Sequence, residues 1–293
     1  MEKFQQTAII GVGLMGGSLA KALQKHGLSK SIIGWDLNKS SLQIARDKGI
    51  IDRAATNIKD AITSSDLIII AIPTAAITDM LNKINPHVSP RAIIMDLGST
   101  KGKIVKAAKN IFTDHPQPCF IGGHPIAGSE KSGVKYSKAD LFTDAPFVLT
   151  PLPATPETQL NRIKSLVTAL GAQCWVLKPQ EHDRFLAWIS HLPQLAATTL
   201  MKTIAEQKNA DEALKLAGSG LKDTTRIAAS SSAIWQDIIF TNQENITAIL
   251  QDYIAELKNL QDIIKNSQVE EFSQLMEEAA RSRRNLKNFE LDR

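Results

Sequence analysis

Short apolar runs alternate with segments of helical periodicity through the first half of the chain. The segments between the runs, such as SLAKALQKHG, SSLQIARDKG and STKGKIVKAAKNIF, place apolar residues at helical spacing. Strands that are apolar throughout and alternate with helices are typical of a parallel sheet covered on both faces. We therefore expect an α/β domain with a doubly wound, mainly parallel sheet, whose strands the pattern places at Thr7–Ile10, Ile32–Trp35, Leu67–Ile72, Ala92–Leu97, Phe147–Leu149 and Cys174–Leu177.

The pattern changes after LKPQEHDRF. Beyond this point strand-like runs disappear, and we expect long helices at Glu181–Gln207, Ala210–Leu216, Ala233–Lys265 and Val269–Asn288. The change predicts two domains, residues 1–178 and an all-helical domain of residues 179–293. One stretch of the second domain, ITAILQDYIAELKNLQDII, is apolar on more faces than a short bundle covers. This excess indicates that the helical domain is a dimerisation domain and that the chain forms a homodimer through it.

Composition and charge narrow the class of protein. A hydrophobic content of 43% with 22% charged residues is ordinary for a folded globular chain. The net charge of +4 comes without basic runs interleaved with aromatic residues, which argues against nucleic acid as a partner. Cys119 and Cys174 form no CxxC motif and have no spaced histidine partners, so we expect no metal site. The chain shows no signal-peptide pattern, and its longest apolar run, LIIIAIP, is too short for a membrane span, so we expect a cytoplasmic protein with no membrane partner.

A glycine motif follows the first predicted strand. In AIIGVGLMGGSLA, Gly11, Gly13 and Gly16 form the pattern GxGxxG where a helix begins. The first glycine permits a tight turn, the second lets the backbone approach a pyrophosphate, and the third lets helix and strand pack closely. The free N–H groups of this helix, with Leu14 and Met15 in its first turn, then face the phosphates. This context predicts a Rossmann-like dinucleotide-binding domain.

Asp36 indicates which dinucleotide binds. It follows the second predicted strand, 20 residues beyond Gly16. A carboxylate at this place accepts hydrogen bonds from the adenosine ribose hydroxyls and repels a 2′-phosphate, although Lys39 nearby weakens the repulsion. We therefore expect NAD rather than NADP as the cofactor. Pro73, which ends the run LIIIAIP, and Ser99 complete the predicted cofactor-binding residues.

Two loops that follow predicted strands carry groups suited to chemistry. NAD implies hydride transfer, and in an open α/β sheet ligands lie outside the carboxyl ends of the strands. Ser99 follows one strand in IIMDLGSTKG, and His124 follows the next in the glycine-rich loop FIGGHPIAGSEKSG. Ser99 also fits a helix cap, a role that is compatible with a contact to the reacting groups. A neutral imidazole at His124 can accept a proton near physiological pH.

Five motifs in order along the chain resemble the prephenate and arogenate dehydrogenases of tyrosine biosynthesis. They are GVGLMGGSLA, DLGSTK, GGHPIAGSEKSG, EHDRFLAWISHLPQ and GSGLKDTTRIAASSSAIWQDI, and the resemblance runs almost from end to end. It implies oxidative decarboxylation of prephenate to 4-hydroxyphenylpyruvate with NAD. In that reaction hydride leaves C4 of the ring, the proton of the C4 hydroxyl is accepted, and CO2 departs. The protein supplies a proton acceptor, an anion clamp and placement against the cofactor.

The resemblance also implies roles for particular residues. His124 is the proton acceptor, and Ser99 shares the substrate hydroxyl and orients His124, so both are catalytic. Arg226 binds the side-chain carboxylate of the substrate with two parallel hydrogen bonds, and Asp223 positions Arg226. Ser129 and Glu130 match positions that line or gate the pocket, and His191 and Trp235 match substrate-site positions of the family. Gln194 departs from the pattern, because some relatives carry a second histidine there, but its amide can still form a hydrogen bond with the substrate. These five residues are also expected to bind the substrate.

Two histidines lie near the expected domain boundary. His182 and His191 are nine residues apart, which places them on opposite faces of an undistorted helix. We therefore expect that only one of them faces the substrate pocket. The resemblance favours His191, and His182 is interpreted as a residue at the start of the helix.

The alternatives differ in substrate and in class. Many relatives carry an acidic residue between the arginine of TRIA and the tryptophan, where it could recognise the amino group of arogenate, but this chain has Ser230, Ser231 and Ser232 there. The resemblance therefore favours prephenate, with an arogenate or dual-substrate cyclohexadienyl dehydrogenase as the alternative. A β-hydroxyacid dehydrogenase would need a catalytic lysine where this chain has His and Gln, and a pyrroline-5-carboxylate reductase would not need the His124 loop. An NAD-binding regulator without turnover would not need a proton acceptor there either.

Overall fold

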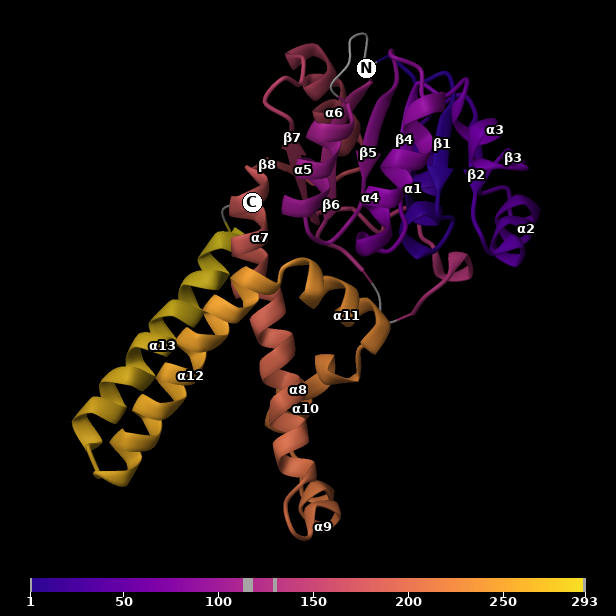
Figure 1. Ribbon diagram of the computed structural model, residues 1–293. Helices are drawn as coiled ribbons and strands as arrows, with labels where there is room; N and C mark the ends of the chain where they lie inside the picture. The colour runs from indigo at the N-terminus through magenta and orange to yellow at the C-terminus, as the bar shows by residue number, and fades with distance from the viewer. Residues whose placement is uncertain (1, 113–117, 129–130, 292–293) are drawn as a thin grey trace. The chain divides into compact units, whose positions relative to one another are not determined.

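One sheet organises the first part of the chain. The structure, a computed structural model, describes residues 2–112, 118–128 and 131–291. Within these residues the strands form a single eight-stranded sheet in the order β3-β2-β1-β4-β5-β6-β7-β8, with all neighbours parallel except β6 and β7 (Figure 1). This confirms the expected Rossmann-like, mainly parallel sheet. Its strands are β1 (Thr7–Ile10), β2 (Ile32–Trp35), β3 (Arg53–Ala54), β4 (Leu67–Ile70), β5 (Ile93–Asp96), β6 (Cys119–Pro125), β7 (Pro146–Pro151) and β8 (Gln173–Val176).

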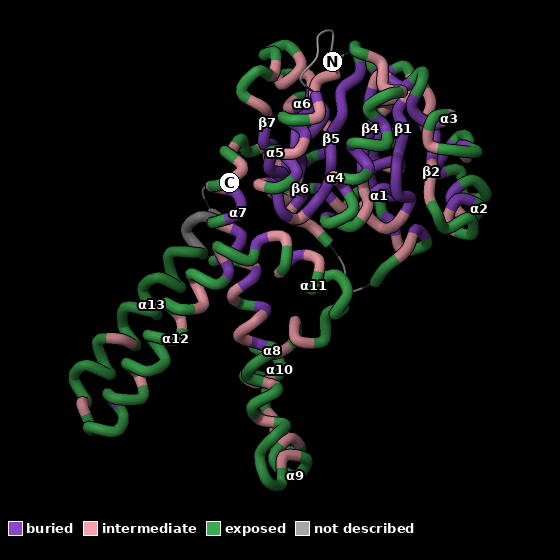
Figure 2. The backbone as a smooth tube through the Cα atoms, in the orientation of Figure 1, coloured by how far each residue is buried: buried purple, intermediate pink, exposed green. Residues whose placement is uncertain are grey.

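Helices cover both faces of the sheet because its central strands are apolar on both sides. In β1, Ile9 packs into one buried apolar cluster, whereas Ala8 and Ile10 pack into another. The first cluster includes residues of α1, α2 and α6, and the second includes residues of α3, α4 and α5. Figure 2 shows the buried strands between these helices, whose outer surfaces are exposed. The helices are α1 (Leu14–Lys25), α2 (Lys39–Asp47), α3 (Ile58–Ile62), α4 (Thr74–Ile84), α5 (Gly102–Ile111) and α6 (Glu157–Ala169).

The segment that follows β8 is helical, as expected, but its first helix is distorted. The expected helix Glu181–Gln207 consists of α7 (Pro179–Leu186), a π-helix (Ala187–His191) and α8 (Leu192–Ala205), which follow one another directly. A π-helix turns through a smaller angle per residue than an α-helix, so it changes which side chains share a face. The remaining elements before residue 242 are α9 (Ala210–Lys215), α10 (Ser219–Thr225), a 3-10 helix (Arg226–Ala229) and α11 (Ser232–Thr241), and two short 3-10 helices lie earlier, at Asn85–His87 and Val134–Tyr136.

The expected single helix Ala233–Lys265 is interrupted at Asn242. The structure divides this segment into α11 and α12 (Gln243–Lys265). Asn242 leaves the helical conformation, with φ −120° and ψ 31°. Its side-chain amide donates a hydrogen bond of 2.7 Å to the backbone carbonyl of Asp183. The expectation of one helix was therefore wrong, because the helix ends where an asparagine bonds a distant segment of backbone, and the periodicity of the sequence does not report such a contact.

The chain forms two compact units, residues 1–243 and 244–293. The first unit contains the sheet and the helices through α11. The second contains α12 and α13 (Val269–Leu291), on which apolar side chains are exposed at Ile254, Leu257, Ile264, Val269, Phe272 and Met276. The domain boundary at residues 178 and 179 stays a prediction. In the described part of the chain, no helix combines the length and the apolar character that a membrane span requires.

Candidate active site

The glycine motif forms the turn that the sequence predicts between β1 and α1. Gly11 has a φ of +92°, and a Cβ atom there would overlap the carbonyl group of Ala71. A Cβ atom on Gly16 would overlap the carbonyl oxygen of Gly11, so close packing requires glycine at both positions. Gly13 is different, because a Cβ atom there would meet nothing within 4 Å. The open space beside Gly13, at the start of α1, therefore fits the pyrophosphate of a dinucleotide.

Asp36 lies beside this turn. Its Oδ2 atom accepts a hydrogen bond of 2.7 Å from the backbone N–H of Val12, and its Oδ1 atom accepts one of 2.8 Å from the N–H of Asn38. These bonds hold the carboxylate between the glycine turn and the start of α2. Because each carboxylate oxygen has more than one lone pair, both can also accept a ribose hydroxyl. The residues present therefore fit the adenosine end of a dinucleotide.

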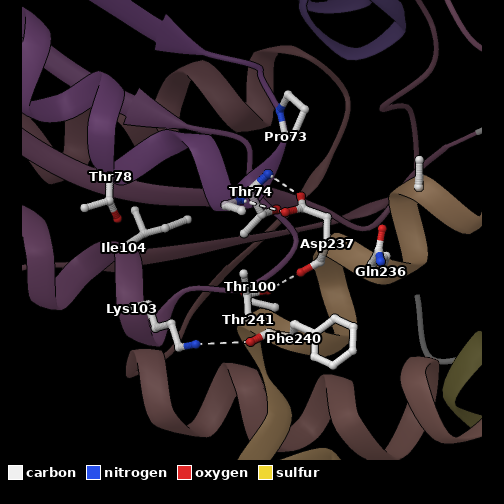
Figure 3. Close-up of a pocket in the computed structure, with 12 residues that line it drawn as sticks. Pro73, Thr74, Thr78, Thr100, Lys103, Ile104, Gln236, Asp237, Phe240 and Thr241 are labelled. Carbon is white, nitrogen blue, oxygen red and sulfur yellow. Dashed lines mark hydrogen bonds between the residues drawn. The ribbon is translucent and has the colours of Figure 1, made fainter.

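Pro73 and Ser99 lie near each other at the carboxyl ends of β4 and β5. Pro73 precedes α4, and the N–H of Ser99 donates a hydrogen bond of 3.0 Å to the hydroxyl oxygen of Thr74. Pro73 also lines a cavity of about 680 Å³ between α4, α5 and α11. In Figure 3, Asp237 of α11 points toward the start of α4, where its carboxylate accepts N–H bonds of 2.5 Å from Thr74 and 2.8 Å from Ala75. Asp237 therefore fixes α11 against the first turn of α4, a contact that the sequence analysis did not identify.

His124 lies within β6, and not in a glycine-rich loop after a strand, as expected from the sequence. It pairs with Val148 of the antiparallel strand β7. The preceding glycines are needed for close packing, because a Cβ atom on Gly122 would overlap the Thr150 hydroxyl and one on Gly123 would lie 2.7 Å from the Asp96 carbonyl oxygen. Glycines that the sequence suggests are flexible thus let neighbouring strands approach closely. The result is a histidine on a strand that is paired with β7.

His182 contacts His124, which corrects the interpretation that His182 only begins a helix. The Nε2 atom of His182 lies 2.8 Å from the Nδ1 atom of His124, and the two rings meet edge to face. The Nδ1 atom of His182 lies 2.8 Å from Oδ1 of Asp183. A π-helix begins at Ala187, between His182 and His191, so the undistorted helix assumed in placing the two histidines on opposite faces is not present.

A buried ion pair between Asp96 and Lys101 lies next to the strand that carries His124. The Lys101 ammonium bonds the Asp96 carboxylate and donates a hydrogen bond of 2.8 Å to the carbonyl oxygen of Gly123, next to His124. Both charged side chains are fully buried. Burial raises the pKa of Asp96 and lowers that of Lys101, and their mutual attraction opposes both shifts. This pair was not predicted from the sequence, although the motif IIMDLGSTKG contains both residues.

Burial keeps the three histidines of the site neutral. It lowers the pKa of His124 well below its ordinary value, and nearby His182, Lys101 and His191 lower it further. Burial also lowers the pKa of His182, although the bond to Asp183 opposes this shift. For His191, burial is again the main cause and lowers the pKa to about 4. At neutral pH each imidazole therefore has one bare nitrogen that can accept a hydrogen bond.

Among the predicted substrate residues of the helical segment, His191 ends the π-helix, Gln194 lies on α8 and Trp235 lies on α11. His191 is buried against the ring of Trp235, at 6.0 Å between ring centroids, and its Nδ1 atom lies 3.3 Å from the side-chain amide of Asn242. Gln194 donates a hydrogen bond of 3.0 Å to the carbonyl oxygen of Ile227. Gln194 and Trp235 also line a cavity of about 330 Å³, together with Ser230 and Ser232.

The remaining predicted substrate residues are Arg226, Asp223, Ser129 and Glu130. Arg226 begins the 3-10 helix after α10, and Asp223 lies one turn earlier on α10. Ser129 and Glu130 lie outside the described residues. Within the described ranges, no group of three or more His, Cys, Asp or Glu residues could hold a metal ion. The roles of Arg226 and Asp223 therefore stay predictions.

The sequence also matches known domain models across most of its length. Residues 19–176 match the nucleotide-binding domain of prephenate dehydrogenase, and residues 178–278 match its dimerization domain. The chain belongs to the prephenate dehydrogenase family. This membership confirms the resemblance drawn from the five motifs and excludes the β-hydroxyacid dehydrogenases and the pyrroline-5-carboxylate reductases.

Individual members of the family agree with this assignment. A prephenate dehydrogenase of Bacillus subtilis is 33% identical over 92% of this chain and 73% of its own length. The crystal structure of a prephenate dehydrogenase from A. aeolicus, in complex with hydroxyphenyl propionate and NAD+, is 34% identical with a TM-score of 0.90, over 97% of this chain and 99% of that one. An arogenate dehydrogenase from Synechocystis is 32% identical with a TM-score of 0.84, over 95% of this chain and 99% of that one. Enzymes for both substrates thus share this fold.

Proposed function

We propose that this chain is an NAD-dependent prephenate dehydrogenase that forms 4-hydroxyphenylpyruvate in tyrosine biosynthesis. The observation that carries the proposal is the placement of His124 on β6, with a lowered pKa and a hydrogen-bonded ring. A sheet of this class binds its ligand at this edge, and a neutral, oriented imidazole is what oxidation of a hydroxyl group requires. The A. aeolicus relative, whose structure contains NAD+ and hydroxyphenyl propionate, supports the choice of cofactor and the aromatic ligand class.

The residues of the chain divide the work of the reaction among them. NAD, when bound, accepts the hydride from C4 of the substrate. His124 accepts the proton of the C4 hydroxyl, and Ser99 orients that hydroxyl from the neighbouring strand end. When CO2 leaves, the two electrons of the bond that joined it to the ring move into the ring. His124 then returns the proton to the oxygen on C4, which becomes the phenol of the product. Proton transfer by His124 is therefore balanced within one turnover.

The helical segment binds the remaining groups of the substrate. Arg226 forms paired hydrogen bonds with the side-chain carboxylate and is positioned by Asp223. His191, Gln194 and Trp235 line the substrate pocket, and Ser129 and Glu130 border or gate it. Asp36, Gly11, Gly13, Leu14, Met15, Gly16 and Pro73 bind the dinucleotide.

We expect the chain to oxidise prephenate at least about tenfold more efficiently than arogenate, in terms of kcat/KM. Ser230 and Ser232 line the cavity that also holds Gln194 and Trp235, and neither serine carries the negative charge that would recognise an amino group. The measurement is the initial rate of NADH formation with each substrate in parallel. Equal or faster turnover of arogenate would contradict the assignment of the serines. No NADH from either substrate, with measurable NAD binding, would instead support the NAD-binding regulator.

We also expect kcat/KM to be at least about tenfold higher with NAD than with NADP, because Asp36 repels a 2′-phosphate. An Asp36→Asn variant removes the charge while its amide oxygen can still accept the N–H of Val12. This variant should have a smaller ratio of kcat/KM with NAD to kcat/KM with NADP, mainly because its KM for NADP is lower. The measurement is kcat/KM for both cofactors at saturating prephenate. A wild-type preference for NADP would overturn this role of Asp36.

We propose that the helical domain, residues 179–293, joins two copies of the chain in a homodimer. The match of residues 178–278 to a dimerization domain supports this arrangement. The exposed apolar side chains of α12 and α13 supply a surface of the kind that obligate interfaces bury. The division into domains 1–178 and 179–293 is part of the same proposal.

A further inference from the structure

The side chains of His124, His182 and Asp183 form a continuous hydrogen-bonded series. The Nδ1 atom of His124 lies 2.8 Å from Nε2 of His182, and Nδ1 of His182 lies 2.8 Å from Oδ1 of Asp183. His182 is completely buried and Asp183 is nearly so. Water therefore does not compete for the bond between His182 and Asp183, and each nitrogen of the series must act either as a donor or as an acceptor toward its neighbour.

The direction of the series is set at Asp183. Its Oδ1 atom accepts the backbone N–H of Lys101 and its Oδ2 atom accepts that of Gly102, each at 2.7 Å. These N–H groups belong to the start of α5, where the helix dipole also favours a negative charge. Asp183 is thus an acceptor on both oxygens. Consequently His182 donates to it, and the proton of the His182 ring is on Nδ1.

The same reasoning fixes the ring of His124. A neutral His182 with its proton on Nδ1 has a bare Nε2 atom, which can only accept. His124 must therefore donate from Nδ1, and its own Nε2 atom is left bare. Among the described residues, none forms a hydrogen bond with Nε2 of His124.

Neutrality of both rings is necessary for this assignment, and the surroundings favour it. Burial lowers the pKa of His124 and of His182. The charged and titratable groups around His124 are Lys101 and His191 besides His182, and those around His182 are Asp183, Lys101 and Asp96. The ammonium of Lys101 opposes a positive charge on either ring, which keeps one bare nitrogen on each.

We propose that His182 and Asp183 are positioning residues that hold His124 in the tautomer with the proton on Nδ1, so that Nε2 faces the substrate hydroxyl. This inference rests on the proposed function for the identity of the hydroxyl, but the tautomer itself does not depend on it. When His124 accepts the substrate proton, its Nδ1–H still donates to His182, and the carboxylate of Asp183 lies on the far side of that ring. The series therefore both orients the base and stabilises its protonated form.

Two substitutions at His182 separate this role from simple packing. In His182→Gln, the amide N–H donates to Asp183 and the amide oxygen then accepts from His124, so the direction of the series is kept. In His182→Leu, similar volume is kept but the acceptor is lost. We expect kcat to fall by about a hundredfold or more in His182→Leu, with KM nearly unchanged, and to stay within about tenfold of wild type in His182→Gln.

The tautomer can be read directly, without substrate. In protein labelled with 15N-histidine, long-range 15N–1H correlations assign the protonated nitrogen of each neutral ring at a pH above the ordinary histidine pKa, and His124→Asn identifies the His124 signals. We expect the His124 proton on Nδ1 in wild type and in His182→Gln, and on Nε2 in His182→Leu. An Asp183→Ala variant should also lose the Nδ1–H tautomer as the single form.

The control for Asp183→Ala is Asp237→Ala. Asp237 also accepts two backbone N–H groups at the start of a helix, those of Thr74 and Ala75, but contacts no histidine in the hydrogen bonds described. Both variants lose a helix cap, and only Asp183→Ala should change the His124 tautomer. A wild-type His124 with its proton on Nε2, or equal kcat values for His182→Leu and His182→Gln, would overturn the inference. If wild type shows the expected tautomer but oxidises no prephenate, the proposed function is wrong and the tautomer assignment stands.

Discussion

Substitution of His124 by asparagine is expected to lower kcat with prephenate by about a thousandfold, within the range of 10² to 10⁴ typical of general-base catalysis. Asparagine can accept a hydrogen bond from the C4 hydroxyl, but it cannot take up the proton as the hydride leaves. The main-chain pairing of residue 124 with Val148 does not depend on the side chain, so β6 is kept. The measurement is the single-turnover rate of NADH formation, with NAD affinity by calorimetry as the control.

The pH dependence gives an independent test of the same residue. His124 acts as a base only when neutral, so kcat/KM falls on the acid side as the pH drops through its pKa in the free enzyme. Because burial holds that pKa well below the ordinary value of 6.5, wild-type kcat/KM should not decline through His124 near pH 6.5 but only at lower pH. The His124→Asn variant should lack this acid limb. Activity of the variant within about tenfold of wild type would show that another group accepts the proton.

Most of the sheet was predictable from the sequence because each of its central strands is marked by its own short run of apolar residues. Strands such as Leu67–Ile70 and Ile93–Asp96 are short apolar runs, and the alternation with helices is sufficient to indicate a parallel sheet. The short edge strand Arg53–Ala54 has no such run, and β6 contains two glycines, which resemble a loop in composition. What distinguishes β6 from a loop is the close approach of β5 and β7, and this is a property of the packed sheet.

The motifs of the site were predictable, but the contacts between them were not. Gly11, Gly13 and Asp36 could be recognised from their spacing along the sequence, and the structure places them around one turn. By contrast, His124 and His182 are 58 residues apart, and their contact depends on how α7 packs against the sheet. The face on which a histidine lies changes where the helix contains a π-turn, and the sequence feature next to this distortion is Pro193, which has no N–H to bond the carbonyl group four residues earlier.

The burial of the charged side chains of Asp96 and Lys101 could not be predicted from the sequence for a similar reason. Aspartate at the end of a strand and lysine before a helix are usually exposed, so the residue types of Asp96 and Lys101 do not indicate burial. Only the packing of β5 and β6 shows that both are enclosed and that Lys101 bonds the carbonyl oxygen next to His124. The ion pair thus connects the stability of the sheet with the position of the proposed base.

Substitution of Lys101 by methionine is expected to lower the free energy of unfolding by about 3–5 kcal/mol, the usual cost of leaving one member of a buried ion pair without its partner. The Asp96 carboxylate would keep one hydrogen bond of 2.8 Å from the N–H of Gly98 on Oδ2, whereas its Oδ1 atom already has no hydrogen-bond partner among the described residues. The carbonyl oxygen of Gly123 would lose its Lys101 donor as well. Urea unfolding at fixed protein concentration measures the loss, provided that the m-value is unchanged.

A second substitution tests whether the uncompensated charge is the cause. Asp96→Asn combined with Lys101→Met removes both charges, so the double variant should recover part of the stability that Lys101→Met loses. Lys103→Met is the matched control, because Lys103 is an exposed lysine two residues away. Its ammonium donates a hydrogen bond of 3.1 Å to the carbonyl oxygen of Phe240. The loss of Lys103 should change the free energy of unfolding by no more than about 0.5 kcal/mol. If Lys101→Met were as stable as Lys103→Met, the buried pair would not stabilise the folded chain.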